Sequence, residues 1–410
     1  MNEPKIQIRI IAALLLAVIS LGIGLFFYGP FSPHLHVNGE LNKPTEQTHQ
    51  KIRDSAISLE PSLDFTQTFG GSLSEDVIDV FYRDERLYVF GNTQSSDYDF
   101  ENSGAYLAIL GKKGNTLGFF TYKGTLVAVT LSDNGFILAL NRDDYPIAYA
   151  IDLSGNEIES LALPCVRKET ALDVKFVDGG YLFVTALTQE ITTITRLKLT
   201  ALTNELKFSG SVVTDEVYSL QYVDTFDVMG KYYLVANALS DIRNMLCVGE
   251  WNNLAFFPKE FSYTVNGLWI TNKTYYLATT IDKTALICDD GKIIELCQSS
   301  QSPTISGENE YVYVSADENF YCTKGDSTLF SAQYGKTDLL SYGDKLYTVS
   351  TANSRVCIRT FFMGSKTYEN SFSYYVLEPK LFICSAGMYV FGYTYNDFGD
   401  QDVTIIKVKY

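Results

Sequence analysis

RLYVFGNT at Arg86–Thr93 and GMYVFGYT at Gly387–Thr394 are nearly the same segment, written near the two ends of a chain of 410 residues. Looser copies lie between them, at Gly135–Arg142, Gly180–Leu187, Lys231–Ala238, Thr274–Ile281, Glu310–Asp317 and Lys345–Ala352. Intervals of roughly 35 to 50 residues are typical of the blades of a β-propeller. The sequence therefore predicts an internal repeat of eight units.

Each copy lies in the same pattern of short apolar runs separated by turn residues. Gly, Asn and Asp precede the copies, as at Asp133–Gly135, and supply the positive φ angles of tight hairpins. One run precedes each turn, a third follows the copy, and a fourth follows a further turn, as at Lys292–Gln298. Four antiparallel strands make one blade. We predict an all-β fold, a closed propeller of eight four-stranded blades; seven is the alternative, because the unit at Pro303–Gly335 is the shortest.

The last unit lacks a fourth strand, because the chain stops at Tyr410 after the third run. Asp64–Gly71 (DFTQTFGG) is a strand-like segment that belongs to no unit. We predict that it pairs with Val403–Lys409, which completes the eighth blade, closes the ring and removes an open sheet edge.

Ile10–Phe27 is apolar, carries no charge and follows Lys5 and Arg9. Eighteen apolar residues can cross a bilayer as a helix, and no small-x-small cleavage site follows them. Positive charge on the short side directs the rest of the chain outward. We expect an uncleaved transmembrane anchor at 1–28, a polar tether at 29–61 and a propeller at 62–410. The protein would be a single-pass cell-membrane protein with its C-terminal domain extracytoplasmic; a cleaved signal is the alternative.

The composition excludes several classes of function. The net charge is −16, with a pI near 4.7, and nucleic-acid binding requires clustered Lys and Arg instead. We expect a monomer without a nucleic-acid partner. The seven cysteines contain no CxxC pair and are expected to be buried free thiols: Cys165, Cys247, Cys288, Cys297, Cys322, Cys357 and Cys384.

All three histidines, His34, His36 and His49, lie in the predicted tether. The propeller therefore lacks the base of a Ser-His-Asp or Cys-His nucleophile, and it lacks histidine ligands for zinc, iron or copper. No P-loop or dinucleotide-binding motif occurs. The sequence assigns no catalytic, cofactor-binding or metal-binding residue.

Two acidic loops and two tryptophans are the remaining candidates for binding. Alternating carboxylates suit calcium, but aspartates in turns usually accept hydrogen bonds from nearby backbone amides, which is the expected role here. The loops contain Asp97, Asp99 and Glu101, and Asp397, Asp400 and Asp402. Trp251 and Trp269 can stack on sugar rings, although packing between blades is the commoner role of tryptophan.

TFGG at Thr68–Gly71, EDVIDV at Glu75–Val80, LYVFGNTQSSDYDF at Leu87–Phe100 and the segment Met388–Tyr410 resemble the bacterial β-propeller repeat with the pattern TFGG…D…G-x-T-x-S-x-D. The resemblance covers two units, about a fifth of the chain, and the other six units lack the pattern. It implies an extracytoplasmic propeller and carries over no catalytic residue.

These observations favour a non-catalytic scaffold whose loops, on one face, hold a protein or glycan partner. The alternative is a carbohydrate-active hydrolase or lyase that uses Asp and Glu alone, because glycoside cleavage needs no histidine. It requires two carboxylates about 5 to 10 Å apart in a pocket. The adjacent pairs Asp143–Asp144 and Asp289–Asp290 are poor evidence for such convergence. An envelope-assembly factor with an exposed apolar patch is a third possibility.

Overall fold

The computed structural model describes residues 55–56, 63–95, 104–143, 145–165, 168–177, 179–190, 193–213, 219–228, 231–239, 244–250, 255–261, 263–280, 282–298, 300, 302–397 and 399–409. The predicted anchor at 1–28 and nearly all of the tether at 29–61 lie outside these residues. Within them, every regular element is a β-strand. No helix with the length and hydropathy of a membrane span occurs in the part of the chain that the structure describes.

The described strands form eight antiparallel sheets, and seven of these have four strands each. The first four sheets are β3 (Asp79–Arg83), β4 (Arg86–Thr93), β5 (Gly104–Leu110) and β6 (Thr116–Lys123); β7 (Thr125–Leu131), β8 (Gly135–Arg142), β9 (Tyr145–Asp152) and β10 (Glu157–Ala162); β11 (Glu169–Val177), β12 (Gly180–Glu190), β13 (Thr193–Thr203) and β14 (Phe208–Val213); and β15 (Ser219–Val228), β16 (Lys231–Leu239), β17 (Asn244–Glu250) and β18 (Ala255–Phe261).

The next three sheets follow the same order, and the segment at Pro303–Gly335 contains a complete sheet despite its short length. They are β19 (Thr264–Ile270), β20 (Thr274–Thr279), β21 (Lys283–Cys288) and β22 (Ile293–Gln298); β23 (Thr304–Glu308), β24 (Tyr311–Ala316), β25 (Asn319–Lys324) and β26 (Ser327–Gln333); and β27 (Thr337–Tyr342), β28 (Lys345–Ala352), β29 (Arg355–Phe362) and β30 (Ser365–Phe372). The eight copies of the motif are the second strands of the sheets, as predicted.

The eighth sheet combines both ends of the described chain. Its order is β1 (Ser55–Ala56), β2 (Leu63–Phe69), β33 (Gln401–Val408), β32 (Gly387–Tyr395) and β31 (Leu377–Cys384). The predicted pairing is confirmed, since Phe65 lies opposite Lys407 and Phe69 lies opposite Val403. The short strand β1, within the segment expected to be tether, pairs with β2 as a fifth strand.

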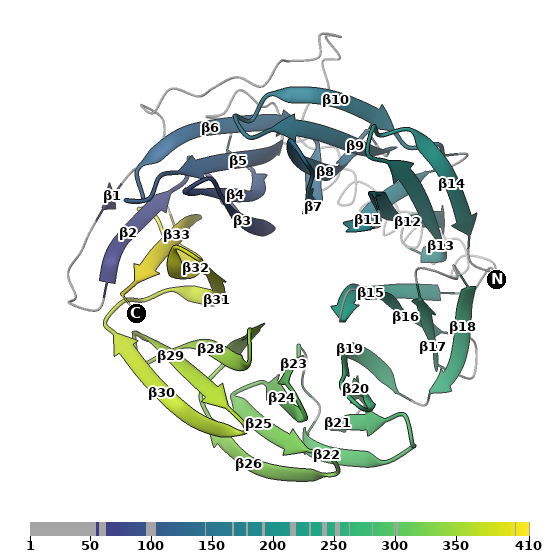
Figure 1. Ribbon diagram of the computed structural model, residues 1–410, viewed down its shortest axis with the longest axis vertical. Helices are drawn as coiled ribbons and strands as arrows, with labels where there is room; N and C mark the ends of the chain where they lie inside the picture. Colours follow the sequence, from purple (N-terminus) through teal and green to yellow (C-terminus); the bar gives the residue numbers. More distant parts are fainter. Residues whose placement is uncertain are drawn as a thin grey trace, which may run out of the picture.

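The sheets stand around a common central space in the arrangement of a β-propeller (Figure 1). The first strand of each sheet faces this space and the fourth lies at the outer rim (Figure 1). The connections between second and third strands, and from each sheet to the next, emerge on one side of the disc, which we call the loop face. The turns between first and second strands, and between third and fourth, form the opposite turn face.

Turn residues make this repeated hairpin geometry possible. Asp84 and Glu85 have φ angles of 51° and 61° between β3 and β4, which is the left-handed conformation of a tight hairpin. Gly155 and Gly291 have φ angles of 83° and 86° in turns between third and fourth strands. These are the turns that the Gly, Asn and Asp pattern predicted.

The core lies between neighbouring sheets. Phe69 of β2 contacts Tyr106 and Phe119 of the first sheet, with ring centroids 6.0 and 6.4 Å apart, and both faces of that sheet are covered. Every residue of β5 is therefore buried. This explains the continuous apolar strands, since a strand between two neighbours has no solvent-facing side.

Candidate functional site

A side chain at the seventh position of the repeated motif ties one sheet to the next. The Asn92 side chain accepts a hydrogen bond from the backbone N–H of Leu126 at 2.7 Å and donates to the Leu126 carbonyl at 3.0 Å. The same pair of bonds joins Asn141 to Ala171 and Asn237 to Val265. The sequence analysis missed these inter-sheet clamps, although Asn recurs at this position in RLYVFGN, GFILALN and KYYLVAN.

Tyr393 occupies the same motif position in the last copy. Its hydroxyl accepts a hydrogen bond from the backbone N–H of Val77, at 3.2 Å, in the connection that leads into the first sheet. The contact between the eighth and first sheets therefore uses the same position with a different side chain.

Four aspartates and one lysine share one register position on the first strands. Each lies opposite the fifth residue of its motif copy: Asp79 opposite Phe90, Asp173 opposite Val184, Asp224 opposite Val235, Asp338 opposite Val349 and Lys380 opposite Phe391. Since first strands face the central space, this position is the charged part of its wall (Figure 1). The sequence analysis missed it; the signal was an aspartate before an aliphatic residue, in IDV, LDV and TDL.

Two of these carboxylates, those of Asp79 and Asp338, accept hydrogen bonds from the backbone of the first strands. The N–H of Val80 donates to Asp79 at 2.7 Å, and the N–H of Leu381 donates to Asp338 at 2.9 Å across the junction of the seventh and eighth sheets. Burial raises the pKa of Asp79 to about 6, while the Val80 hydrogen bond and the charge of Lys175 lower it. Cations lie among the carboxylates, so the position is not a uniformly acidic surface.

A buried ion pair holds the connection between the second and third sheets. Lys198 Nζ lies 3.3 Å from Glu169 Oε1 and also donates to the Pro164 carbonyl. Thr185 donates to the second oxygen of Glu169 at 3.2 Å. Both charged groups are buried and engaged, which is the arrangement of a structural contact.

A buried pair of carboxyl groups, Glu75 and Asp402, lies where the eighth sheet meets the first. Glu75, in the connection from β2 to β3, is 2% exposed, and Asp402 of β33 is 4% exposed. Ser95 and Thr93 donate to Glu75 Oε1 at 2.6 and 2.9 Å. Thr93 and Ser95 are the T-x-S of the repeat pattern that the sequence resembles, so the pattern supplies the hydrogen bonds of this junction.

Of the two predicted acidic loops, one lies outside the described residues and the other forms hydrogen bonds of its own. Asp97, Asp99 and Glu101 lie outside the described residues. In the loop Asp397–Asp402, the Asn396 side chain accepts from the N–H of Asp400 at 3.0 Å and donates to Asp402 at 3.1 Å. No group of three or more His, Cys, Asp or Glu side chains in the described part of the chain is arranged to hold a metal ion.

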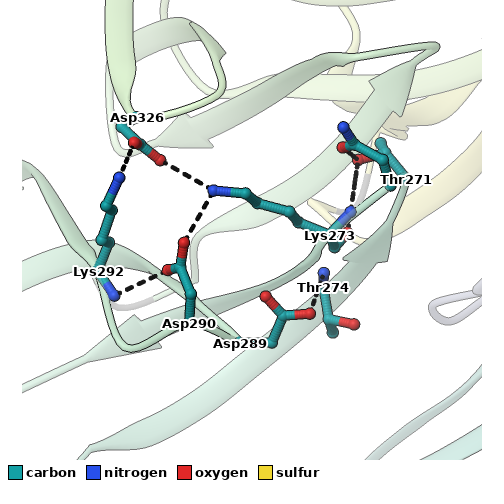
Figure 2. A network of polar contacts seen from close by, with 8 residues as sticks. Thr271, Lys273, Thr274, Asp289, Asp290, Lys292 and Asp326 are labelled. Carbon is teal, nitrogen blue, oxygen red and sulfur yellow. Dashed lines mark hydrogen bonds and ion pairs between the residues drawn. The ribbon is translucent and has the colours of Figure 1, made fainter.

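Figure 2 shows an exposed network of ion pairs that joins the fifth and sixth sheets on the turn face. Lys273 Nζ lies 2.8 Å from Asp290 and 3.3 Å from Asp326, which belongs to the next sheet. Lys292 also pairs with Asp326. The four charges neutralise one another at the surface.

The adjacent aspartates Asp289 and Asp290 of the sequence analysis do not converge. Asp289 accepts from the N–H of Thr274 at 3.1 Å, whereas Asp290 points to Lys273 (Figure 2). Asp143 has a φ of 51° and pairs with Arg142, while Asp144 is not described. Asp289 and Asp290 therefore do not have the geometry of two carboxylates around one bond.

Trp269 packs between sheets, which agrees with the packing role that the sequence analysis predicted. It is half-buried against the core shared by β19 to β25, and a Cβ atom at Gly307 of β23 would lie 2.0 Å from its indole nitrogen. The tryptophan therefore occupies space that a side chain at Gly307 would need, and it offers no open platform to a sugar. Trp251 lies outside the described residues.

Six cysteines are described as free thiols, and the prediction of burial holds for two of them. Cys288 and Cys322 are buried, and burial raises the pKa of the Cys322 thiol to about 12. The other four are half-buried: Cys165, Cys297, Cys357 and Cys384. The side chain of Cys247 lies outside the described residues.

Exposed apolar side chains gather on the loop face at the junction of the eighth and first sheets. Tyr375, Tyr395 and Leu73 are 51%, 60% and 42% exposed, and we call these three residues the junction patch. Tyr395 pairs across β32 and β33 with Gln401, whose N–H donates to the Ser74 hydroxyl next to Leu73. Tyr375 lies two residues before β31, the strand paired with β32, so the patch spans one corner of the disc.

Comparison with known proteins supports the fold alone. No protein-family model matches the chain, and no curated protein matches its sequence. The dihydro-heme d1 dehydrogenase NirN, solved in complex with DHE, has a TM-score of 0.51 and 9% identity over 80% of this chain and 75% of that one. Apo AztD from Citrobacter koseri gives 0.46, 10% identity and coverage of 79% and 94%. The WD40 β-propeller domain of Doa1 gives 0.45, 12% identity and coverage of 84% and 96%. The eight sheets around a common central space, together with the similarity to NirN, show that the chain has a β-propeller fold.

Proposed function

We propose that the chain is a single-pass membrane protein whose extracytoplasmic domain is a closed, eight-bladed propeller that binds a protein or glycan partner without catalysis. Residues 1–28 would be the anchor, 29–61 the tether and 62–410 the monomeric propeller. The eight sheets and the pairing of β2 with β33 support the closed ring. The uncharged segment Ile10–Phe27 supports the anchor.

The junction patch is the observation that carries the binding role. Tyrosine is enriched at binding sites because its ring contributes apolar contact and its hydroxyl contributes a hydrogen bond. Tyr375 and Tyr395 are both more than half exposed and lie at one corner, beside the exposed Asp397. Apolar side chains that gather on the surface of a soluble domain commonly mark an interaction site.

The carboxylates favour a non-catalytic role over glycoside cleavage. That reaction needs two carboxyl groups that reach a sugar in a pocket. The convergent pair in the described part of the chain, Glu75 with Asp402, is 2% and 4% exposed, so a polysaccharide has no access to it. No described feature favours the hydrolase or lyase.

The binding role is tested with the full-length protein purified in mild detergent. Tyr375→Ala combined with Tyr395→Ala removes the patch, while Tyr342→Ala combined with Met363→Ala removes two exposed apolar side chains from the turn face. We expect a partner captured from solubilised membranes, or a polysaccharide on a glycan array, to be retained by the wild type and the turn-face variant. Loss of at least tenfold in the patch variant supports the proposal, and equal retention by both variants refutes it.

The proposed location has its own test. A protease added to intact cells should cut the tether at 29–61 and release the propeller, because compact sheets resist cleavage while exposed polar segments do not. A propeller that stays cell-associated and uncut until the cells are lysed would contradict an extracytoplasmic domain.

A further inference from the structure

The junction of the eighth and first sheets contains a carboxyl oxygen for which the described residues provide no hydrogen-bond partner. Glu75 is fixed in place, because its N–H donates to the Gln401 carbonyl at 3.0 Å and it forms a β-bridge with Thr93. Its Oε1 accepts from Ser95 and Thr93. Its Oε2 is buried and has no hydrogen-bond partner within the described residues. A buried carboxylate oxygen without a donor is costly, which calls for a proton or a cation.

Glu75 Oε2 and the carboxyl of Asp402 both lie beside Gly70. A Cβ atom at Gly70 would lie 2.3 Å from Asp402 Oδ1 and 2.7 Å from Glu75 Oε2. Both oxygens therefore lie within 2.7 Å of one point, in the space left by the missing side chain. Gly70, the first glycine of TFGG, leaves the space that the two carboxyls occupy, and the backbone of Gly71, the second glycine, lowers the pKa of Glu75 by hydrogen bonding.

Two ionised carboxylates that lie beside the same glycine repel each other, and burial strengthens the repulsion. The neutral form of one of them is favoured for the same reason that paired aspartates in proteases hold one proton. Burial is the largest cause that raises the pKa of Glu75, to about 7, and the charge of Asp402 raises it further. The hydrogen bonds from Ser95 and Thr93 lower it.

The other polar groups around the junction have their own partners. The Asp76 carboxylate accepts from the N–H of Asn92 at 2.5 Å. The Tyr106 hydroxyl donates to the Asp76 carbonyl at 2.7 Å, and the Tyr393 hydroxyl accepts from Val77. Glu75 has no ion pair with a described lysine or arginine, so no cationic side chain compensates its charge.

We propose that Glu75 and Asp402 share one proton, which lies on Glu75 Oε2 and is donated to Asp402 Oδ1, and that this proton makes the contact between the first and last sheets sensitive to pH. The carboxyl pair becomes a hydrogen-bonded acid and carboxylate when the proton is present. Loss of the proton leaves two buried negative charges that repel each other. This repulsion pushes Glu75, in the connection from β2 to β3, away from Asp402 in β33.

The sign of the effect follows from the direction of the shift. The carboxyl of Glu75 binds its proton more tightly in the joined sheets than in the separated chain. The contribution to stability is therefore fully present below the ordinary pKa of 4.5 and is lost as the pH rises through about 7. The junction should be tighter in mildly acidic than in mildly alkaline solution.

Hydrogen exchange of the full-length protein in mild detergent tests this inference, with rates corrected for intrinsic pH dependence. We expect the protection of the β2 and β33 amides to fall roughly tenfold or more between pH 5.5 and 8, relative to β24 amides, since one pKa unit corresponds to a factor of ten. In Glu75→Gln, which carries no titrating proton, this fall should vanish. A fall that persists in Glu75→Gln overturns the proposal.

Two controls keep the test decisive. Asp79→Asn removes another carboxyl with a raised pKa and should leave the pH dependence at β2 unchanged. Asp402→Asn removes the negative charge of the acceptor, so the loss of protection should have its midpoint at a lower pH than in the wild type. This variant tests the proposal independently if Glu75→Gln fails to fold. Recovery of protection at pH 8 on addition of calcium chloride would show that a cation, and not a proton, fills the site.

Discussion

Two junctions between neighbouring sheets are held together by different polar contacts. One joins the eighth sheet to the first, and the other joins the fifth sheet to the sixth. Both have an apolar core. The first adds buried groups, with Glu75 held by Thr93 and Ser95, whereas the second adds the exposed Lys273–Asp290–Asp326 network (Figure 2). The fifth and sixth sheets each form from four consecutive strands, whereas the eighth sheet is completed by β2, which is held to β33 by non-covalent contacts.

This difference indicates where specificity is needed. Misplaced buried polar groups cost far more than misplaced surface charges, so buried contacts select one register and exposed ion pairs barely do. The two ends of the chain must find each other in one register, and the TFGG and T-x-S residues are present at that junction. The middle sheets lack this pattern, and each of them forms from consecutive strands, so none requires the two ends of the chain to meet.

Phe69→Ala should have the largest effect, because it removes a buried ring at the non-covalent junction. Phe69 is 1% exposed and contacts Tyr106 and Phe119. The loss of burial and the cavity should lower the free energy of unfolding by about 3–5 kcal/mol. Chemical denaturation measures this, with Leu117→Ala, an exposed outer-strand residue, as the control that stays within about 0.5 kcal/mol. A cost for Phe69→Ala no greater than that of the control would show that β2 does not support the fold.

Lys198→Met tests a buried contact away from the closing junction and should have nearly as large an effect. It leaves Glu169 buried without its cation and removes the donor of the Pro164 carbonyl. Breaking a buried pair by removing one partner costs about 3 kcal/mol or more. The double variant Lys198→Met with Glu169→Leu should recover part of the loss in denaturation experiments. If the single variant is as stable as the wild type, the pair is not buried in solution.

Asn92→Ala should have a smaller effect, since it removes one inter-sheet clamp and leaves the Leu126 N–H and carbonyl without that partner. The cost of leaving such groups unsatisfied is about 1–3 kcal/mol. Asn141→Ala, at the equivalent position, should cost a similar amount, because it breaks the same pair of bonds to Ala171. Widely different values for the two variants, measured by denaturation, would show that the clamp is not one repeated device.

The sequence predicted the features that repeat locally. The motif copies, the turn residues such as Asp84 and Gly155, and the unassigned strand before the first unit all followed from hydrophobic pattern and turn chemistry. The pairing of β2 with β33 followed from counting strands. The motif copies and turns depend on near neighbours in the chain, and the pairing of β2 with β33 depends on the number of strands in each unit, which is why one sequence is sufficient to find them.

The contacts between sheets were not predicted, because their partners are distant in sequence. Asn92 resembles a turn or strand-end residue until the register places it beside Leu126. Asp79 resembles an ordinary polar residue of an alternating strand until the first strands are known to face the central space. Glu75 and Asp402 share no local pattern at all, and only the position of Gly70 between them reveals that they converge.

Lys273→Ala should have the smallest effect and is the sharpest test of the contrast between the two junctions. The ammonium group is exposed at the surface, where solvent screens its attraction to Asp290 and Asp326, and exposed ion pairs contribute little to stability. We expect no measurable change in the unfolding temperature at physiological salt, and at most a small decrease at low salt. Lys283→Ala, which removes another surface pair with Glu295 inside one sheet, is the matched control. A clear loss of stability in Lys273→Ala but not in Lys283→Ala would mean that surface charge does hold the middle sheets together, and the distinction between the two junctions would then fail.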